Sequence, residues 1–341
     1  MKVWISRTDR LGDVVMALPA LDYLRQALPT AELVFSCSPN FRKLVLPFLN
    51  ARRIQWCDPR DADFSSFTAG LFLNMDLKLL LRAWKARLRM RVGALSRWPS
   101  FLLLNQGIRQ VRSSAEKNEG RYTLDLAEHL VELLTNRHLP SEKEPRLTIE
   151  GEPSEALIAR NILLGLGIQE GDKFIVLHPG TGGTAINLSP NHFVDVAESL
   201  EKASGLPLIL TQGPSSVDAE VVQYLQQHYK KLPVVRDQEL EVIREIFRLA
   251  FAVVGPSTGT LHLAHLMGTR TLGLYAPIRA QCPSRWGFWG GEGRADILVP
   301  NVECPGTSRC IGPRCKEYFC MEKLPWGRLI LEWGNDLKSL E

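Results

Sequence analysis

The most constraining feature of this sequence is a pattern that occurs in both halves of the chain: short apolar runs alternate with longer amphipathic runs. Strands alternating with helices in this way predict parallel sheets built from repeated βαβ units. In the first half we expect strands at residues 2–6, 31–36 and 71–75 and a helix at 13–28. Residues 174–177 restart the pattern with an unbroken apolar strand of the kind buried in a parallel sheet.

The second half follows the same order of elements. Ser189 and Pro190 suit the N-cap and the first position of a helix. The expected helices of this half are 190–203, 215–229 and 239–250, and its further expected strands are 206–210, 251–254 and 271–275.

The length of 341 residues favours two domains, because one hydrophobic core seldom supports a chain this long. Residues 141–172 contain several prolines and acids and are the best linker candidate, although 154–164 has a helical pattern. We therefore expect an N-terminal Rossmann-like domain at 1–150 and a C-terminal one at 151–325. A closing helix at 326–341 is expected to pack across the domains.

Composition excludes several classes of protein. With 45% hydrophobic and 23% charged residues the chain matches an ordinary soluble globular protein. No secretory signal is visible, no apolar run is long enough for a membrane helix, and seven cysteines without secretory context indicate reduced thiols. These features predict a cytoplasmic protein.

A basic segment stands out at residues 77–115, which contain nine Lys or Arg and no acid. Such a local excess favours an anionic partner, whereas the simpler alternative is a solvated helix face. The leucines and Trp84 between the cations favour a half-buried amphipathic segment. Nucleic-acid binding would need more than one such segment, so we do not expect it.

The first of three chemically suggestive turns is Arg7–Asp13, where Gly12 is expected to let the backbone turn and Asp13 to begin a helix. Asp13 has two interpretations. It is either an N-cap that accepts backbone N–H bonds, or a carboxylate kept ionised by the helix N-terminus and a nearby Arg, ready to take a proton from a hydroxyl.

The other two turns are His178–Thr184 and Gly255–Thr260, each between an apolar run and a helical pattern. Glycine N–H groups and threonine hydroxyls suit a phosphate cradle. All three turns follow strands, and ligands bind at the carboxyl ends of strands in open α/β sheets. Two such turns in one half favour a diphosphate site. Neither follows the G-x-G-x-x-G pattern of nicotinamide dehydrogenases.

Three strings carry a family resemblance: RTDRLGDVVMALPAL (7–21), HPGTGGTAINLSPNHF (178–193) and GPSTGTLHLAHLMGT (255–269). In content, order and separation they resemble the bacterial lipopolysaccharide heptosyltransferases, glycosyltransferase family 9. The resemblance implies a GT-B fold, in which two Rossmann-like domains with parallel sheets face each other across a cleft. It also implies transfer of heptose from a nucleotide sugar, ADP-heptose, to a lipid-linked core oligosaccharide at the cytoplasmic face of the inner membrane.

The resemblance also assigns roles to residues. Asp13 would be the general base of an inverting transfer that needs neither a metal nor another cofactor. The acceptor would meet Arg7, Arg10 and Gly12, and the basic stretch at 78–97 could meet its phosphate or carboxylate groups. The donor would be held by Thr181, Gly182, Gly183, Thr184, Asn187, Ser257, Thr258, Gly259, Thr260 and His262, whereas His178 would brace its loop.

The sequence departs from the family on the donor side. Ile186 stands where many members carry a basic residue, which implies a slower enzyme, an altered donor, lost catalysis, or a cation supplied from elsewhere, such as Arg279 or Arg285. Ser257 and Thr260 replace the usual acid and proline of their turn. Asp218 and Glu220 are stand-ins for an acid that binds the donor ribose. Two alternatives therefore remain: a family member with a different nucleotide sugar, and a catalytically impaired relative that binds a nucleotide or glycan.

Four cysteines close the sequence: Cys304, Cys310, Cys315 and Cys320. Four thiolates can hold zinc, but these lack the C-x₂-C spacing typical of such sites. We expect reduced structural thiols and no metal, with zinc as the alternative.

Overall fold

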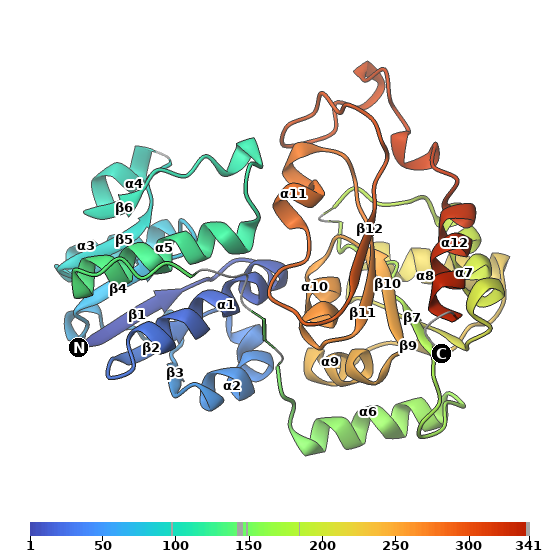
Figure 1. The fold of residues 1–341 in the computed structure, drawn as a ribbon, viewed down its shortest axis with the longest axis horizontal. Coiled ribbons are helices and arrows are strands. Elements are labelled where there is room, and N and C mark those ends of the chain that lie inside the picture. The colour runs from blue at the N-terminus through green and yellow to red at the C-terminus, as the bar shows by residue number, and fades with distance from the viewer. Residues whose placement is uncertain (97, 142–145, 148, 184, 339–341) are drawn as a thin grey trace. The chain divides into compact units, whose positions relative to one another are not determined.

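The computed structural model describes residues 1–96, 98–141, 146–147, 149–183 and 185–338. The chain forms two compact units (Figure 1). Unit 1 comprises Met1–Glu150 and Trp289–Gly291, and unit 2 comprises Gly151–Phe288 and Glu292–Glu341. In the part of the chain that is described, no helix is long and apolar enough to cross a membrane.

Unit 1 contains a parallel sheet of six strands in the order β3-β2-β1-β4-β5-β6. The strands are β1 (Lys2–Ser6), β2 (Glu32–Ser36), β3 (Ile54–Trp56), β4 (Ala69–Phe72), β5 (Met90–Ala94) and β6 (Gln106–Ile108). The helices are α1 (Leu11–Ala27), α2 (Arg42–Ala51), α3 (Leu77–Lys85), α4 (Trp98–Leu103) and α5 (Glu119–Thr135).

Unit 2 contains a second parallel sheet of six strands, in the order β12-β11-β10-β7-β8-β9. Its strands are β7 (Ile175–Leu177), β8 (Leu208–Thr211), β9 (Val234–Val235), β10 (Ala252–Pro256), β11 (Arg270–Leu274) and β12 (Ala295–Leu298). Its helices are α6 (Pro153–Gly165), α7 (Pro190–Ser204), α8 (Ser216–His228), α9 (Leu240–Leu249), α10 (Gly259–Leu266), α11 (Pro283–Trp286) and α12 (Trp326–Lys338).

The two sheets have the same connectivity. In each, the first strand of the unit lies in the middle, with the second and third on one side and the fourth to sixth on the other. This is the order of doubly wound nucleotide-binding folds, and it places the topological switch point between the first and fourth strands. The expected pair of α/β halves with parallel sheets is therefore confirmed.

The end of β1 is held by a dense aromatic core. Trp4 is fully buried, with its ring centroid 4.8 Å from that of Phe64 and 5.2 Å from that of Phe72. The Trp4 indole N–H donates to Ser36 Oγ at 3.0 Å, on the neighbouring strand. The loop after β1 therefore starts from a rigid support.

The closing helix α12 packs along α7, within unit 2. A Cβ added at Gly334 would lie 2.5 Å from the Cβ of Ala203, so the glycine permits this close approach. The expectation that this segment also reaches the first unit stays a prediction.

Candidate active site

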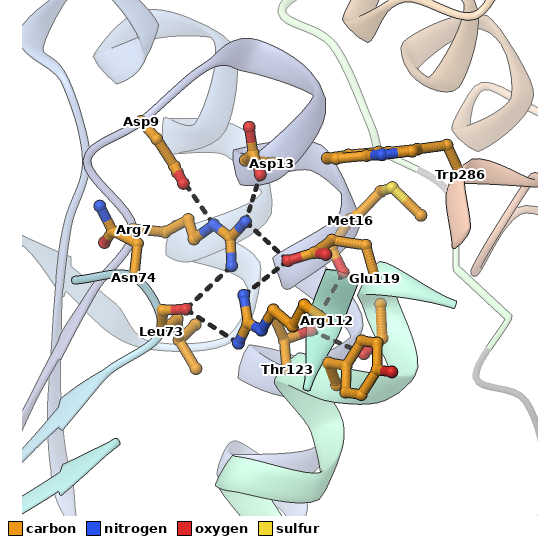
Figure 2. A network of polar contacts seen from close by, with 12 residues as sticks. Arg7, Asp9, Asp13, Met16, Leu73, Asn74, Arg112, Glu119, Thr123 and Trp286 are labelled. Atoms are coloured by element: carbon orange, nitrogen blue, oxygen red, sulfur yellow. Dashed lines mark hydrogen bonds and ion pairs between the residues drawn. The ribbon is translucent and has the colours of Figure 1, made fainter. Parts of the chain in front are cut away.

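The centre of the site in unit 1 is Arg7, which directly follows β1 and is 1% exposed. Its Nε donates to Asp9 at 2.9 Å and its second terminal nitrogen to Glu119 at 3.1 Å and to Asp13 (Figure 2). Its remaining terminal nitrogen donates to the Leu73 carbonyl at 3.0 Å, in the loop after β4. Arg7 therefore ties together the loops that leave the two strands at the switch point.

The charge of Arg7 is fixed by its surroundings. Burial alone would lower the pKa of this guanidinium, but Asp13, Asp9 and Glu119 outweigh burial and raise it above its ordinary value. Arg7 is thus a permanent cation whose donors are used inside the protein.

Glu119 and Arg112 anchor the other side of the network. Glu119 is 1% exposed and accepts from Arg112 at 2.6 Å in addition to Arg7. Arg112 also donates to the Leu73 carbonyl at 3.2 Å and to Gln110. Two guanidinium groups therefore share one buried carboxylate and one carbonyl.

The N-terminus of α5, which carries Glu119, is fixed in two ways. Asn118 caps it by accepting from the Gly120 N–H at 2.8 Å. Trp289, from the late segment that joins unit 1, packs directly on Gly120, where an added Cβ would lie 2.2 Å from the indole. Any larger residue at 120 would displace either the indole or the helix.

Asp13 does not occupy the predicted position at the start of helix α1. Helix α1 begins at Leu11, so Asp13 is its third residue, and the N-cap is Arg10, which makes no side-chain cap bond. The N-cap interpretation of Asp13 is wrong because its carboxylate bonds Arg7 instead of a backbone N–H. Gly12, expected to form the turn, lies inside the helix and is buried.

The position of Asp13 still suits chemistry. The first turn of a helix stabilises an anion, and the side chain is 15% exposed while Arg7 beneath it is 2% exposed. Figure 2 shows one carboxylate oxygen directed at Arg7 and the other directed away from it.

Arg10 and Thr8 complete the loop after β1. Arg10 is exposed. The Thr8 hydroxyl donates to Asp76 at 2.9 Å, and its N–H donates to the Asn74 side chain at 3.2 Å. Because Asp76 is also the N-cap of α3, these bonds fix the Arg7–Asp13 loop to the loop after β4.

Asp9 is the second carboxylate on Arg7. Burial raises the pKa of Asp9 to about 6 from 3.8, with Asp13 adding to the rise and Arg7 opposing it. An acid whose pKa is raised by folding stabilises the fold while it is protonated, and it loses that contribution as the pH rises through the folded pKa.

We therefore predict that the free energy of unfolding of wild type, relative to Asp9→Asn, falls as the pH is raised from about 4 to about 7. Urea unfolding of both proteins across this range measures the difference. A difference that stays constant, or that grows with pH, would contradict the raised pKa.

In unit 2, Asp218 organises the glycine-rich loop after β7. This carboxylate is 3% exposed and accepts from the backbone N–H groups of Thr181 at 2.8 Å and Gly182 at 3.0 Å. Added Cβ atoms at Gly180 and Gly213 would lie 2.7 Å and 2.3 Å from its atoms, so both glycines are needed for its approach. Two N–H groups expected to cradle phosphate are thus already bonded to protein.

The loop is held from its other side as well. The Asn187 amide donates to the Pro179 carbonyl at 2.8 Å. His178 Nδ1 lies 2.9 Å from the Thr211 hydroxyl, and burial lowers the pKa of His178 to about 4, so its ring is neutral. Gly182 and Gly183 remain exposed. Thr184 lies outside the described residues.

If this loop holds the nucleotide that the family resemblance implies, replacing Asp218 by alanine is predicted to weaken ADP binding by about tenfold or more, because two charge-assisted bonds that shape the loop are lost. Calorimetric titration with ADP measures this. Gln223→Ala is the matched control, since Gln223 is on the same helix but exposed. Equal affinities of the two variants would show that Asp218 does not shape a nucleotide site.

The third turn leads into α10, whose N-cap is Thr258. The Thr258 and Thr260 hydroxyls lie 2.9 Å apart, and the region Ser257–Thr260 is half-buried. Since β7 and β10 are paired, this turn leaves the same edge of the sheet as the glycine-rich loop. The two turns are therefore neighbours at the switch point of unit 2.

His262 lies in the first turn of α10 and is 3% exposed. Burial, with a smaller effect of His265, lowers its pKa to about 3, and its ring packs near Phe288 with centroids 5.9 Å apart. Its Nδ1 has no hydrogen-bond partner among the described residues. His262 is thus a neutral ring.

The four late cysteines line one cavity of about 160 Å³, together with Ile186 and Asn187. All four are free thiols. Burial and the other three cysteines raise the pKa of Cys320. In the described part of the chain, however, no group of three or more His, Cys, Asp or Glu side chains is arranged to hold a metal ion.

A model of glycosyltransferase family 9 (heptosyltransferase) matches residues 109–294, which is more than half of the chain. The chain belongs to this family. A putative glycosyltransferase of Haemophilus influenzae is 27% identical over 303 residues, covering 84% of this chain and 85% of that protein. Lipooligosaccharide heptosyltransferase 2 of Campylobacter jejuni is 21% identical, covering 99% of both chains.

The fold agrees with this membership. The structure of the ADP-heptose lipopolysaccharide heptosyltransferase II of E. coli superposes with a TM-score of 0.73 at 15% identity, covering 100% of this chain and 99% of that chain. The GT-B architecture with two parallel six-stranded sheets is therefore confirmed. As a family 9 member, the chain is a heptosyltransferase-like glycosyltransferase.

Sequence reasoning missed two residues of the unit 1 site in this family 9 glycosyltransferase, because Glu119 and Arg112 were not singled out as site residues. Asp218 was named as a stand-in for the acid that binds the donor ribose, and the structure shows it bracing the glycine-rich loop. The one local signal for Glu119 is the pair Asn118-Glu119, a cap followed by an acid in the first turn of a helix.

Proposed function

We propose that this glycosyltransferase moves heptose from ADP-heptose to a hydroxyl of a lipopolysaccharide core acceptor, with inversion and without a metal. The observation that carries the proposal is Asp13: a partly exposed carboxylate in the first turn of α1, beside the switch point of unit 1 and bonded to a buried, anchored cation. Such a group is held in place and open to a substrate.

In the proposed reaction, the free oxygen of Asp13 removes the proton of the acceptor hydroxyl. The acceptor oxygen forms a bond to the anomeric carbon as the bond from that carbon to the diphosphate breaks. The leaving group is ADP, and the proton remains on Asp13 until solvent takes it. A single displacement of this kind inverts the anomeric configuration.

Arg7 was expected to contact the acceptor. Its burial and its bonds to Asp9, Asp13, Glu119 and Leu73 instead support a role in positioning Asp13. Among the predicted acceptor residues, Arg10 is the exposed one, and we assign it to the acceptor.

We assign the ADP to unit 2, at the two turns on its switch-point edge. Among the first-turn N–H groups of α10, that of Leu261 donates to the N-cap Thr258, whereas those of Gly259 and Thr260 have no acceptor within the helix and favour an anion. Gly182 and Gly183 are exposed at the neighbouring turn, and Arg279, after β11 at the same edge, is an exposed cation. These groups would neutralise the leaving diphosphate.

A different nucleotide sugar is the second candidate, and Ile186 favours it. This side chain packs against the apolar core of unit 2, and its N–H donates to Gln281 at 2.9 Å, so the position supplies no cation. A catalytically impaired relative remains the third candidate.

A panel of ADP-, GDP- and UDP-sugars tests the proposal, with a water-soluble core oligosaccharide as the acceptor and binding of each nucleotide measured separately. We expect turnover with ADP-heptose. Turnover with another donor alone would establish the second candidate, and nucleotide binding without turnover of any donor would establish the third.

A further inference from the structure

Helix α3 of unit 1 presents large apolar side chains to solvent. Leu77, Leu81 and Trp84 are 43%, 43% and 51% exposed, and their spacing places them on one face. The opposite face, with Leu79, Leu80 and Ala83, is buried in the core. Helix α3 is therefore apolar on two faces, of which the protein covers one.

Helix α4 packs beside α3 and repeats the arrangement. Trp98, Phe101 and Leu102 are 73%, 56% and 60% exposed. We use the name α3–α4 face for the six exposed apolar residues of these two neighbouring helices: Leu77, Leu81, Trp84, Trp98, Phe101 and Leu102. An exposed apolar group of this size marks an interaction surface.

Cations adjoin the α3–α4 face. Lys78, Lys85, Arg87 and Arg89 are exposed, and none forms an ion pair with any described residue. Three of them, with Trp84, Leu88 and Arg91, line a hollow of about 610 Å³. No acid occurs in residues 77–115 to neutralise them.

Other cations of the basic segment donate hydrogen bonds to backbone carbonyls of the protein, unlike the exposed ones. Arg82 donates to the carbonyls of Pro59, Arg60 and Ala62. Arg91 donates to the Leu103 carbonyl at 2.6 Å. Arg97 lies outside the described residues.

We propose that the α3–α4 face docks on a bilayer that contains anionic phospholipid. Tryptophan, phenylalanine and leucine enter the interface between headgroups and acyl chains, while the adjoining lysines and arginines bind lipid phosphates in and around the hollow. A protein partner would need complementary apolar and acidic surfaces, whereas an anionic bilayer offers both in one plane. The inference deepens the proposed function, whose acceptor is lipid-linked, but the contact needs no substrate.

Sedimentation with phosphatidylcholine vesicles, with and without a third of phosphatidylglycerol, tests the contact. We expect binding to the anionic vesicles alone, and weaker binding as sodium chloride screens the charges. The triple variant Lys85→Gln/Arg87→Gln/Arg89→Gln should partition about 100-fold more weakly. Trp84→Ser/Trp98→Ser/Phe101→Ser should lose binding to the same vesicles at any salt concentration.

The matched control is Leu157→Ser/Ile158→Ser/Leu164→Ser on α6, whose side chains are 60%, 46% and 46% exposed in the other unit. It should bind vesicles as wild type does, and circular dichroism should show all variants folded. Equal binding by wild type and the two α3–α4 variants would overturn the proposal. The proposal would also be overturned if wild type bound no vesicles and the two α3–α4 variants were monomers where wild type is a dimer. That result would identify a second copy of the chain as the partner of the α3–α4 face.

Activity separates this inference from the proposed function. Both α3–α4 variants should lose transfer to acceptor embedded in anionic vesicles while retaining transfer to the water-soluble oligosaccharide. Loss of both would mean that the cations bind the acceptor and would overturn the bilayer contact. Vesicle binding by a protein that turns over no donor would refute the proposed function and leave the contact standing.

Discussion

Asp13→Asn is expected to lower kcat for heptose transfer by roughly 10²–10⁴-fold, while ADP binding and the fold are retained. The amide has the size of the carboxylate and still accepts from Arg7, but it cannot take the acceptor proton. Initial rates at saturating donor and acceptor, combined with calorimetric titration of ADP, measure the two properties separately.

Asp9→Asn is the matched control, because Asp9 is also bonded to Arg7, at 2.9 Å, on the same loop. It should lower kcat by about tenfold at most, since Asp9 holds Arg7 but does not take the proton. If Asp13→Asn kept a rate within the range of Asp9→Asn, the assignment of Asp13 as the base would be wrong.

Glu119→Ala is expected to reduce the free energy of unfolding by about 3–5 kcal/mol. Glu119 is 1% exposed and accepts from Arg7 at 3.1 Å and Arg112 at 2.6 Å, so its removal leaves the nearly buried Arg7 without one of its carboxylates. Urea unfolding, followed by circular dichroism, measures the loss.

Two further variants make this result interpretable. Glu116→Ala, at an exposed acid three residues earlier, should change the free energy of unfolding by less than about 0.5 kcal/mol. Glu119→Gln keeps an acceptor oxygen, so its loss in free energy of unfolding should lie between those of Glu116→Ala and Glu119→Ala. It replaces Glu119→Ala in the test if the alanine variant does not fold. A loss below about 1 kcal/mol in Glu119→Ala would show that the network is dispensable for the fold.

Local patterns in the sequence predict much of the fold. The apolar runs of β1 and β7 and the Ser189-Pro190 start of α7 are each specified by neighbouring residues, and the structure has them within about two residues. The paired turns of unit 2 were also predictable, because strands followed by glycine-rich turns end at one edge of a parallel sheet.

The interior of the site was not predictable in this way. Arg7 and Glu119 are 112 residues apart, and Thr181 and Asp218 are 37 apart, so no local pattern joins them. The start of α1 was misplaced because Asp13 is a good N-cap residue, whereas in the fold Arg7 competes for its carboxylate. The ion pair between Asp13 and Arg7 therefore overrides the local preference of Asp13 for the N-cap position.

The configuration of the product tests the central claim, that Asp13 acts as a base in one displacement, most directly. Wild-type protein would be given ADP-heptose and a water-soluble core oligosaccharide, and the new glycosidic linkage determined by proton NMR. The account predicts an anomeric configuration opposite to that of the donor. A retained configuration would indicate two successive displacements and would contradict the assignment of Asp13 as a general base.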